Sequence, residues 1–205
     1  MILIGITGII GSGKTTVSSM LSQEGIPVID LDRLGKEVTD YEEVVREIQE
    51  LFGAEFIVNA KANIEKMREI AFVDTETRKK LEAIIHPRVR VELWRRINQF
   101  KAEGAPVVIV DAPLLFETGL YKKLDKVVVV SADMDKIKER LRLRGMEEED
   151  ANRRLPHQMP LAEKEKMADH VLYNNGTEED LKKELRALLL RIKEWEARDL
   201  CTLKI

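Results

Sequence analysis

Five short apolar runs, separated by longer segments of helical periodicity, set the pattern of the chain. Each run is rich in Val and Ile, which is typical of strands that are buried on both faces of a parallel sheet. They are ILIGIT at 2–7, IPVID at 26–30, PVVIVDAP at 106–113, DKVVVVSA at 125–132 and, more faintly, DHVLYN at 169–174. The pattern predicts an α/β fold, doubly wound, with a parallel five-stranded sheet flanked by helices.

The segments between the runs predict how the chain is divided. Residues 35–104 are too many for a simple crossover and read as helices throughout, so they predict a helical insertion into a core of 1–34 and 105–205. Residues 145–168 are crowded with charge and hold two prolines, which predicts either a solvated surface or a lid built as helix, break, helix. The last segment predicts a long amphipathic helix whose apolar face carries Leu181, Leu185, Leu188, Leu189, Ile192 and Trp195.

Charge and composition limit the classes of partner that this chain can be expected to bind. Lys and Arg number 34 and Asp and Glu 37, a net charge of -3, so no overall basic field favours nucleic acid or an anionic membrane. No apolar run approaches the roughly 20 residues that span a bilayer, and a cytoplasmic protein is expected. Cys201 is the only cysteine, which excludes an internal disulfide. A small-molecule partner is favoured, and the composition predicts no oligomeric state.

The stretch GIIGSGKT carries the strongest chemical signal. It fits the pattern GxxxxGK(S/T) and stands between the first predicted strand and a helical segment, which is the setting of a P-loop. Backbone N–H groups of such a loop, and the start of the helix after it, hold phosphate oxygens. Lys14 is expected to reach the β- and γ-phosphates of ATP, and the Thr15 hydroxyl to bind Mg²⁺. The predicted nucleotide contacts are Gly8, Gly11, Ser12, Gly13, Lys14, Thr15 and Thr16.

Three classes of P-loop protein remain open at this point: a small-molecule kinase, a GTPase switch and an ATPase subunit of a machine. A GTPase needs an NKxD motif, and the nearest candidate, NNGT at 174–177, has neither the Lys nor the Asp. A machine ATPase usually has a larger domain. A kinase needs a carboxylate near the acceptor hydroxyl and cations over the transferring phosphoryl group.

Asp30 and Asp32 close the second predicted strand, at the edge of the sheet that faces a P-loop in this fold class. Strand alternation would put both carboxylates on one side, where one could accept a proton from the acceptor hydroxyl. The alternative is that either residue caps the helix that follows.

The order and spacing of several motifs closely resemble the dephospho-CoA kinase family. They are the P-loop, VIDLD at 28–32, HP at 86–87, DAPLLFE at 111–117, and RRLPHQMPLAEKEKMADHVLYNNG at 153–176. The resemblance covers nearly the whole chain, and the combination is far more specific than its P-loop. It implies transfer of the ATP γ-phosphoryl group to the ribose 3′-hydroxyl of dephospho-CoA. The alternative is another P-loop small-molecule or nucleoside monophosphate kinase.

The resemblance also implies roles for single residues. Asp32 becomes the expected catalytic base, and Arg154 of the lid the expected partner of the transferring phosphoryl group, although a lid arginine could equally be a surface charge. Expected nucleotide contacts outside the P-loop are Arg140, Arg144 and Asn175, the last in a loop that turn chemistry could also explain. Expected acceptor contacts besides Asp32 are His86, Leu114, Leu115 and Phe116.

Several of these residues have a purely structural alternative. His86 could stand at the start of a helix whose first residue is Pro87, and Leu114 to Phe116 could be ordinary core. Asp111 could orient water on Mg²⁺ or cap a turn. Two departures from the family pattern are Ile9, where a second glycine is common, and Asn63-Ile64 in place of Asp-Arg, a change that Arg68 could offset.

Overall fold

A computed structural model describes residues 1–146 and 158–202. These residues belong to two compact units, the first made of Met1–Ile29 with Phe100–Ile205 and the second of Asp30–Gln99. The second unit thus begins a few residues before the boundary that the sequence pattern suggests. The division of the chain by function, into a nucleotide-binding core and an acceptor domain, stays a prediction.

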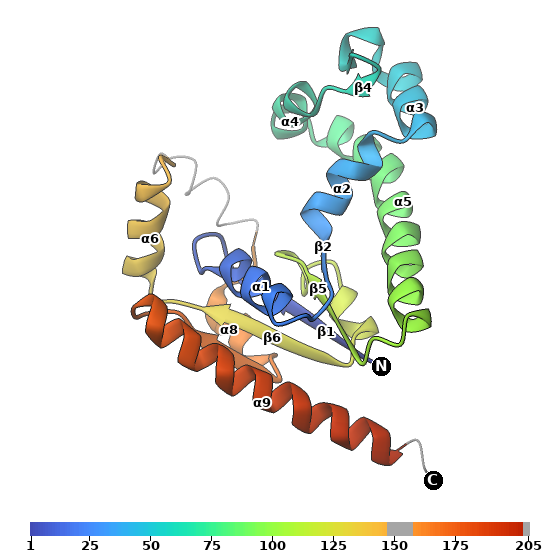
Figure 1. Ribbon diagram of the computed structural model, residues 1–205. Coiled ribbons are helices and arrows are strands. Elements are labelled where there is room, and N and C mark those ends of the chain that lie inside the picture. Colours follow the sequence, from blue (N-terminus) through green and yellow to red (C-terminus); the bar gives the residue numbers. More distant parts are fainter. Residues whose placement is uncertain (147–157, 203–205) are drawn as a thin grey trace. The chain divides into compact units, whose positions relative to one another are not determined.

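The first unit alternates strands and helices along the chain (Figure 1), as the apolar runs predict. Its strands are β1 (Ile2–Thr7), β2 (Val28–Asp30), β5 (Val107–Asp111), β6 (Lys126–Ser131) and β7 (His170–Tyr173). Its helices are α1 (Lys14–Gln23), η2 (Leu120–Lys123), α6 (Met134–Leu143), α8 (Leu161–Lys166) and α9 (Glu178–Thr202).

The five strands form one sheet in the order β2-β5-β1-β6-β7, with β1 in the centre. β1 pairs in parallel with both β5 and β6, and β6 pairs in parallel with β7. The predicted parallel five-stranded sheet is therefore confirmed. Ile6 lies opposite Asp111 in the β1–β5 register, so the carboxyl end of β5 adjoins the point where the chain leaves β1 for the P-loop.

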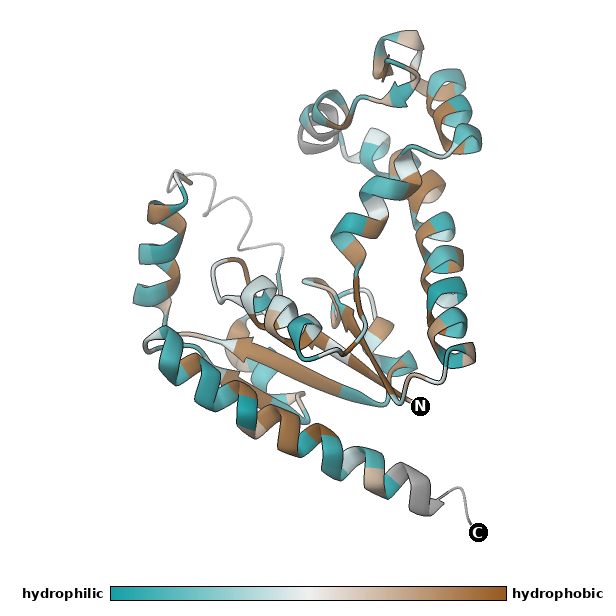
Figure 2. Ribbon diagram, viewed as in Figure 1, coloured by the Kyte–Doolittle hydropathy of each residue, from teal (hydrophilic) through white to brown (hydrophobic). Residues whose placement is uncertain are grey.

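One face of this sheet is covered by α1 and α9. Both helices turn apolar side chains toward the strands, which are brown along most of their length in Figure 2. Val17 of α1 and Leu188 of α9 are fully buried, and Trp195 is 5% exposed. Burial of one such leucine contributes about 2 kcal/mol, which makes this layer a major part of the core. The predicted apolar face of the last helix is confirmed.

The second unit has its own core beneath four helices. Its elements are α2 (Leu31–Thr39), α3 (Glu42–Phe52), η1 (Ala54–Phe56), β3 (Ile57–Val58), β4 (Lys61–Ala62), α4 (Ile64–Val73) and most of α5 (Thr75–Ala102). The buried apolar residues of this core are Val38, Val44, Ile48, Phe56, Ala62, Met67, Leu81 and Ile84.

The prediction of helices throughout this segment is wrong at one place. β3 and β4 form a small antiparallel hairpin, joined by Asn59 and Ala60 with φ angles of 51° and 60°. Two successive positive φ angles are those of a type I′ turn, whose twist matches a two-stranded hairpin. Two-residue strands are too short to produce an alternating pattern in the sequence.

The helices of both units are too short or too polar for a membrane span in the part of the chain that the structure describes. Among residues 1–146 and 158–202, none combines sufficient length with sufficient apolar character to cross a bilayer.

Candidate functional site

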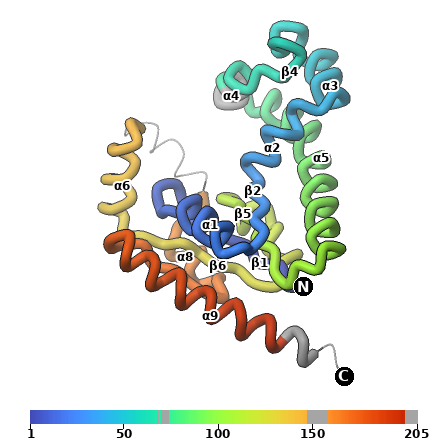
Figure 3. Tube along the Cα trace, in the orientation of Figure 1, coloured from blue at the N-terminus to red at the C-terminus, as the bar shows by residue number. Residues whose placement is uncertain are grey.

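The P-loop connects β1 to α1 in the first unit, at the blue start of the chain in Figure 3. Gly13 stands directly before α1 with a φ of 97°, a conformation that disfavours a side chain. A Cβ atom added there would lie 2.1 Å from Nδ2 of Asn174. A Cβ added at Gly8 would lie 2.6 Å from both the Ser12 hydroxyl and the carbonyl oxygen of Val130. The loop closes this tightly only with glycine at both positions.

The beginning of α1 is suited to an anion. No side chain caps this helix, and its first turn contains no acidic residue. The Ser12 hydroxyl is buried and has no hydrogen-bond partner within the described part of the chain. An uncapped helix N-terminus next to an unpartnered buried hydroxyl fits the phosphates of a nucleotide, which would supply the missing acceptors.

Lys14 forms an ion pair with Asp111, which is only 1% exposed at the end of β5. The other carboxylate oxygen of Asp111 accepts a hydrogen bond of 2.6 Å from the Ser18 hydroxyl of α1. Both contacts link Asp111 to α1. Asp111 therefore lies beside the P-loop lysine, where its carboxylate could serve Mg²⁺. Thr15 and Thr16, in the first turn of α1, are exposed.

Arg140 and Asn174 both bind the backbone of the P-loop at Ser12. Nδ2 of Asn174 donates to the carbonyl oxygen of Ser12 at 2.9 Å, and the Arg140 guanidinium donates to the same oxygen at 3.4 Å. Arg140 also donates to the backbone carbonyl of Asn174 at 2.7 Å. These contacts fix the loop after β7 against the phosphate loop. The family resemblance places Asn174 in a loop near the adenine, and turn chemistry is the alternative. Neither predicts the contact with Ser12, because the two residues lie 162 positions apart.

Asn175 and Arg144, two further residues predicted to contact the nucleotide, lie at the two ends of α6. The side chain of Asn175 accepts a 2.7 Å hydrogen bond from the backbone N–H of Asp133, directly before α6, and Arg144 is exposed directly after α6. Arg154 lies outside the described residues. Gln158, from the same lid motif, accepts a 3.0 Å hydrogen bond from the backbone N–H of Ile10 in the P-loop.

The departure at Ile9 has a structural explanation. Its side chain is 6% exposed and packs with Ala132, Ile137 and Leu141. Among the described residues, Asn59 and Ala60 are the only non-glycine residues with a positive φ, so Ile9 carries no left-handed strain. The P-loop accommodates an apolar residue here because the loop packs against α6.

Asp30 and Asp32 belong to the second unit, and the structure corrects how they were expected to lie. β2 ends at Asp30, whose side chain accepts hydrogen bonds of 2.9 and 3.0 Å from the backbone N–H groups of Asp32 and Arg33. Asp30 is thus the cap of α2, as the alternative interpretation held, and Asp32 is an exposed residue of its first turn. The alternation argument is wrong because Asp32 is helical.

The predicted acceptor residues have different environments. His86 is exposed in the interior of α5, which begins at Thr75, so the structural alternative, a helix that starts at Pro87, is wrong. Leu115 is fully buried, and a Cβ added at Gly5 would lie 2.6 Å from it. Phe116 is 4% exposed, whereas Leu114 is 40% exposed. Of the three, only Leu114 offers appreciable surface to a ligand.

Asn63, the polar half of the second departure, caps a helix. Its side chain accepts a 3.1 Å hydrogen bond from the backbone N–H of Lys66 at the beginning of α4. Asn is a good helix cap. This structural role accounts for Asn63 without any contact to the phosphoryl acceptor. The structure does not describe the side chain of Arg68, so its compensating role stays a prediction.

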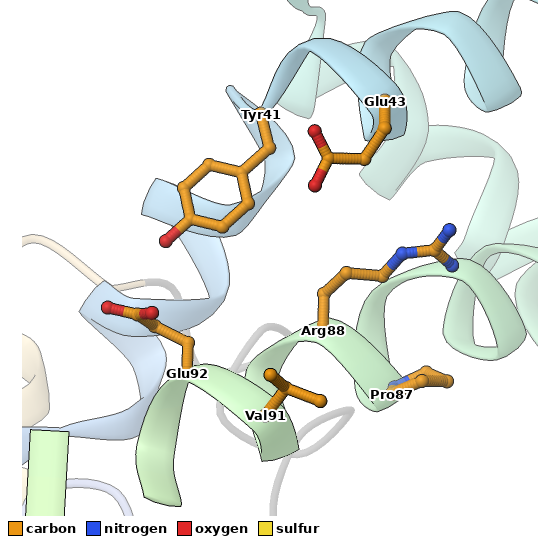
Figure 4. Close-up of a pocket in the computed structure, with 6 residues that line it drawn as sticks. All are labelled: Tyr41, Glu43, Pro87, Arg88, Val91 and Glu92. Atoms are coloured by element: carbon orange, nitrogen blue, oxygen red, sulfur yellow. The ribbon is translucent and has the colours of Figure 1, made fainter. Parts of the chain in front are cut away.

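A shallow pocket of about 230 Å³ lies inside the second unit, between α5 and the junction of α2 with α3 (Figure 4). It is lined by Tyr41, Glu43, Pro87, Arg88, Val91 and Glu92. Glu92 is 7% exposed, and hydrogen bonds from Arg95 and then Arg96 lower its pKa to about 2, against the opposing effect of burial. Arg96 also pairs with Glu37 of α2. This charge network joins α2 to α5 beside the pocket.

The described residues contain no group of three or more His, Cys, Asp or Glu side chains that could hold a metal ion by themselves. Mg²⁺ usually keeps several waters and takes only one or two protein ligands besides substrate phosphates. The Thr15 hydroxyl and the Asp111 carboxylate are oxygen ligands of the kind that it prefers.

The chain is similar to proteins named dephospho-CoA kinase. A protein from Geobacillus kaustophilus named dephospho-CoA kinase is 42% identical over 197 residues, which span 95% of this chain and 96% of that protein. A crystal structure from Thermus thermophilus has a TM-score of 0.81 at 38% identity and covers 93% of this chain and 97% of its own. Dephospho-CoA kinase from Campylobacter jejuni has a TM-score of 0.70 at 26% identity, covering 94% and 97%.

A sequence model of one family extends over most of the chain. The family is described as dephospho-CoA kinase, and its model matches residues 2–180. The match includes the P-loop, Asp111, Arg140 and Asn174, and it ends shortly after α9 begins. This chain belongs to the dephospho-CoA kinase family.

Proposed function

We propose that this chain phosphorylates dephospho-CoA with ATP, giving CoA and ADP in the last step of coenzyme A biosynthesis. The observation that carries the proposal is the P-loop with its Lys14–Asp111 pair, in a chain that belongs to this family over residues 2–180. The acceptor atom is the 3′-hydroxyl of the ribose. The net charge of -3 and the absence of a basic field favour a small-molecule substrate over nucleic acid or membrane.

The donor side of the reaction belongs to the P-loop. Lys14 leaves Asp111 and pairs with the β- and γ-phosphates of ATP, while the N–H groups at the start of α1 bind phosphate oxygens. Phosphoryl transfer has a loose transition state, so fixed positive charge around the γ-phosphoryl group is the main contribution that a protein can make. Arg154 supplies further positive charge from the lid.

Mg²⁺ neutralises charge on the phosphates when it is bound. The Thr15 hydroxyl and the Asp111 carboxylate would hold it. Release of Asp111 by Lys14 leaves this carboxylate available for that task.

The acceptor side belongs to Asp32. Its carboxylate accepts or orients the proton of the 3′-hydroxyl as the oxygen attacks the γ-phosphorus. Asp32 is exposed at the first turn of α2, where its carboxylate is accessible to a ligand. His86, Leu114, Leu115 and Phe116 are the proposed acceptor contacts, with Leu115 and Phe116 contributing from the packed layer behind Leu114.

An acceptor panel tests the proposal. Purified protein is supplied with ATP and Mg²⁺ and with dephospho-CoA, AMP, CMP or shikimate in separate reactions, and products are measured by mass spectrometry. We expect CoA and ADP in equal amounts and a kcat/KM for dephospho-CoA far above the others. Preference for another acceptor would reject the substrate and leave a P-loop small-molecule kinase, the alternative that the sequence left open.

A further inference from the structure

Lys164 is a lysine of α8 that is completely buried. Its ammonium donates to the backbone carbonyl of Pro113 at 2.8 Å and to the Thr7 hydroxyl at 3.4 Å. It also forms an ion pair of 2.9 Å with Glu117. Burial of a charge is costly unless the charge is paired and hydrogen-bonded, and here these three partners match its three N–H groups.

The ammonium therefore has no donor left for a substrate. We therefore look for the role of Lys164 in the segments that its three contacts connect. Thr7 is the last residue of β1 before the P-loop, and Pro113 and Glu117 lie in the loop between β5 and η2. The Thr7 hydroxyl itself donates to the carbonyl oxygen of Pro113 at 3.1 Å.

Glu117 extends the linkage to the segment before α8. One of its oxygens accepts a 2.7 Å hydrogen bond from the backbone N–H of Met159 while its carboxylate pairs with Lys164. The ring of Phe116 lies beneath the cation, 5.9 Å from Nζ to its centroid. Three segments that are far apart in sequence thus meet at one ammonium group.

The pKa of Lys164 reflects the groups around its ammonium. Burial lowers the pKa of Lys164, Glu117 raises it through its hydrogen bond and its charge, and the positive charge of Lys14 lowers it. Lys164 therefore lies within the electrostatic reach of Lys14, the P-loop lysine.

We propose that Lys164 is a positioning residue, which with Glu117 locks the loop Pro113–Glu117 against the end of β1 and so holds the acceptor side of the site in register with the P-loop. The proposal rests on the proposed function, because the family resemblance places Leu114 to Phe116 of this loop at the acceptor. Lys164 acts through the loop and does not touch the reacting groups.

The test compares Lys164→Met, which removes the charge at similar length, with Lys164→Arg, which retains it. Lys166→Met serves as the matched control, because Lys166 is an exposed lysine of the same helix. For each protein we measure kcat, the KM for dephospho-CoA, the Kd of ATP by calorimetry, and hydrogen exchange of a peptide that contains residues 114–119.

Lys164→Met is expected to lower kcat/KM for dephospho-CoA by about 10- to 100-fold, the scale of a misplaced reacting group. The Kd of ATP should change by less than about threefold, because the P-loop contacts are not removed. Exchange in the 114–119 peptide should accelerate. Lys164→Arg should recover most of the activity, and Lys166→Met should match the parent protein.

Glu117→Gln provides a second route if Lys164→Met fails to fold. It should show the same selective loss, and the double variant should lose less than the sum of the single losses, because both changes break one linkage. Parental kinetics with unchanged exchange in Lys164→Met, or an ATP affinity that falls as much as kcat/KM, would overturn the proposal. So would additive losses.

The exchange measurement separates this inference from the proposed function. If the parent protein prefers another acceptor, the proposed function fails, but unlocking of the 114–119 peptide in Lys164→Met still tests the linkage without any acceptor present.

Discussion

Lys14 and Asp111 are 97 positions apart and form an ion pair at the point where the P-loop meets the end of β5. The parallel pairing of β1 with β5 brings them together, since Ile6 lies opposite Asp111. The cation and the carboxylate that we propose for the phosphates and for Mg²⁺ are therefore paired with each other in this structure. Under the proposed function, nucleotide binding replaces this pair by one contact of Lys14 with phosphate and one of Asp111 with Mg²⁺.

Lys14→Ala is expected to reduce turnover by about 10²- to 10³-fold, the scale of removing one group that stabilises transition-state charge. ATP affinity should also fall, because Lys14 contacts the phosphates before the reaction. Steady-state kinetics with dephospho-CoA, with thermal unfolding to verify folding, measures the effect. Unchanged turnover in a folded protein would remove Lys14 from the site.

Asp111→Asn separates two roles of one carboxylate. If Asp111 serves Mg²⁺, the concentration of Mg²⁺ that gives half-maximal turnover should rise by about tenfold or more, the usual scale for lost outer-shell partners. A titration of activity with Mg²⁺ at saturating ATP measures this. A variant with the parental Mg²⁺ dependence would show that Asp111 only restrains Lys14.

Asp32→Asn should slow phosphoryl transfer by about 10²-fold or more and leave ATP affinity largely intact, because an amide cannot accept the hydroxyl proton. Single-turnover transfer measures the chemical step directly. The matched variant is Asp30→Ala, which removes the cap of α2 and should cost about 1 kcal/mol of stability. Asp30→Asn should be milder, because Asn also caps helices. Parental transfer by Asp32→Asn would remove Asp32 from the mechanism.

Gly13→Ala should abolish tight ATP binding, because its Cβ would lie 2.1 Å from Asn174 and the φ of 97° is strained for alanine. Gly25→Ala is the control, since Gly25 has a φ of 83° with no atom within 4 Å of the added Cβ. The control should lose only about 1 kcal/mol of stability and keep its ATP affinity. Calorimetry and thermal unfolding of both variants separate backbone strain from the lost loop geometry.

Glu92→Gln should reduce stability in a manner that depends on pH. The pKa of Glu92 is lowered from 4.5 to about 2 in the folded chain, chiefly by its hydrogen bond to Arg95. Its ionised form therefore stabilises the fold above about pH 4.5, and this contribution disappears as the pH falls toward 2.

Urea unfolding of the parent and Glu92→Gln proteins at several pH values measures this contribution. We expect a difference of about 1 to 2 kcal/mol at pH 6, a range that allows for screening by solvent around the exposed Arg95. The difference should shrink between pH 4.5 and 2. A difference independent of pH would show that the charge of Glu92 contributes nothing.

The sequence by itself determined the features that depend on neighbouring residues. Apolar runs of four to eight residues predict the strands, the spacing of leucines predicts the buried face of α9, and GIIGSGKT between a strand and a helix predicts the phosphate site. These signals are local, because side-chain period and glycine placement act within a few residues of the backbone. The family resemblance added the expected substrate and the candidate residues.

Tertiary structure decided which distant residues meet. Strand order brings Asp111 to Lys14, the loop after β7 brings Asn174 to Ser12, and α8 brings Lys164 to Thr7 and Pro113. Asp30 rather than Asp32 caps α2, because β2 ends at Asp30 and the helix begins at Leu31. Such contacts join residues far apart along the chain, so no local period records them, and only the packing of the sheet and its helices selects among the possible partners.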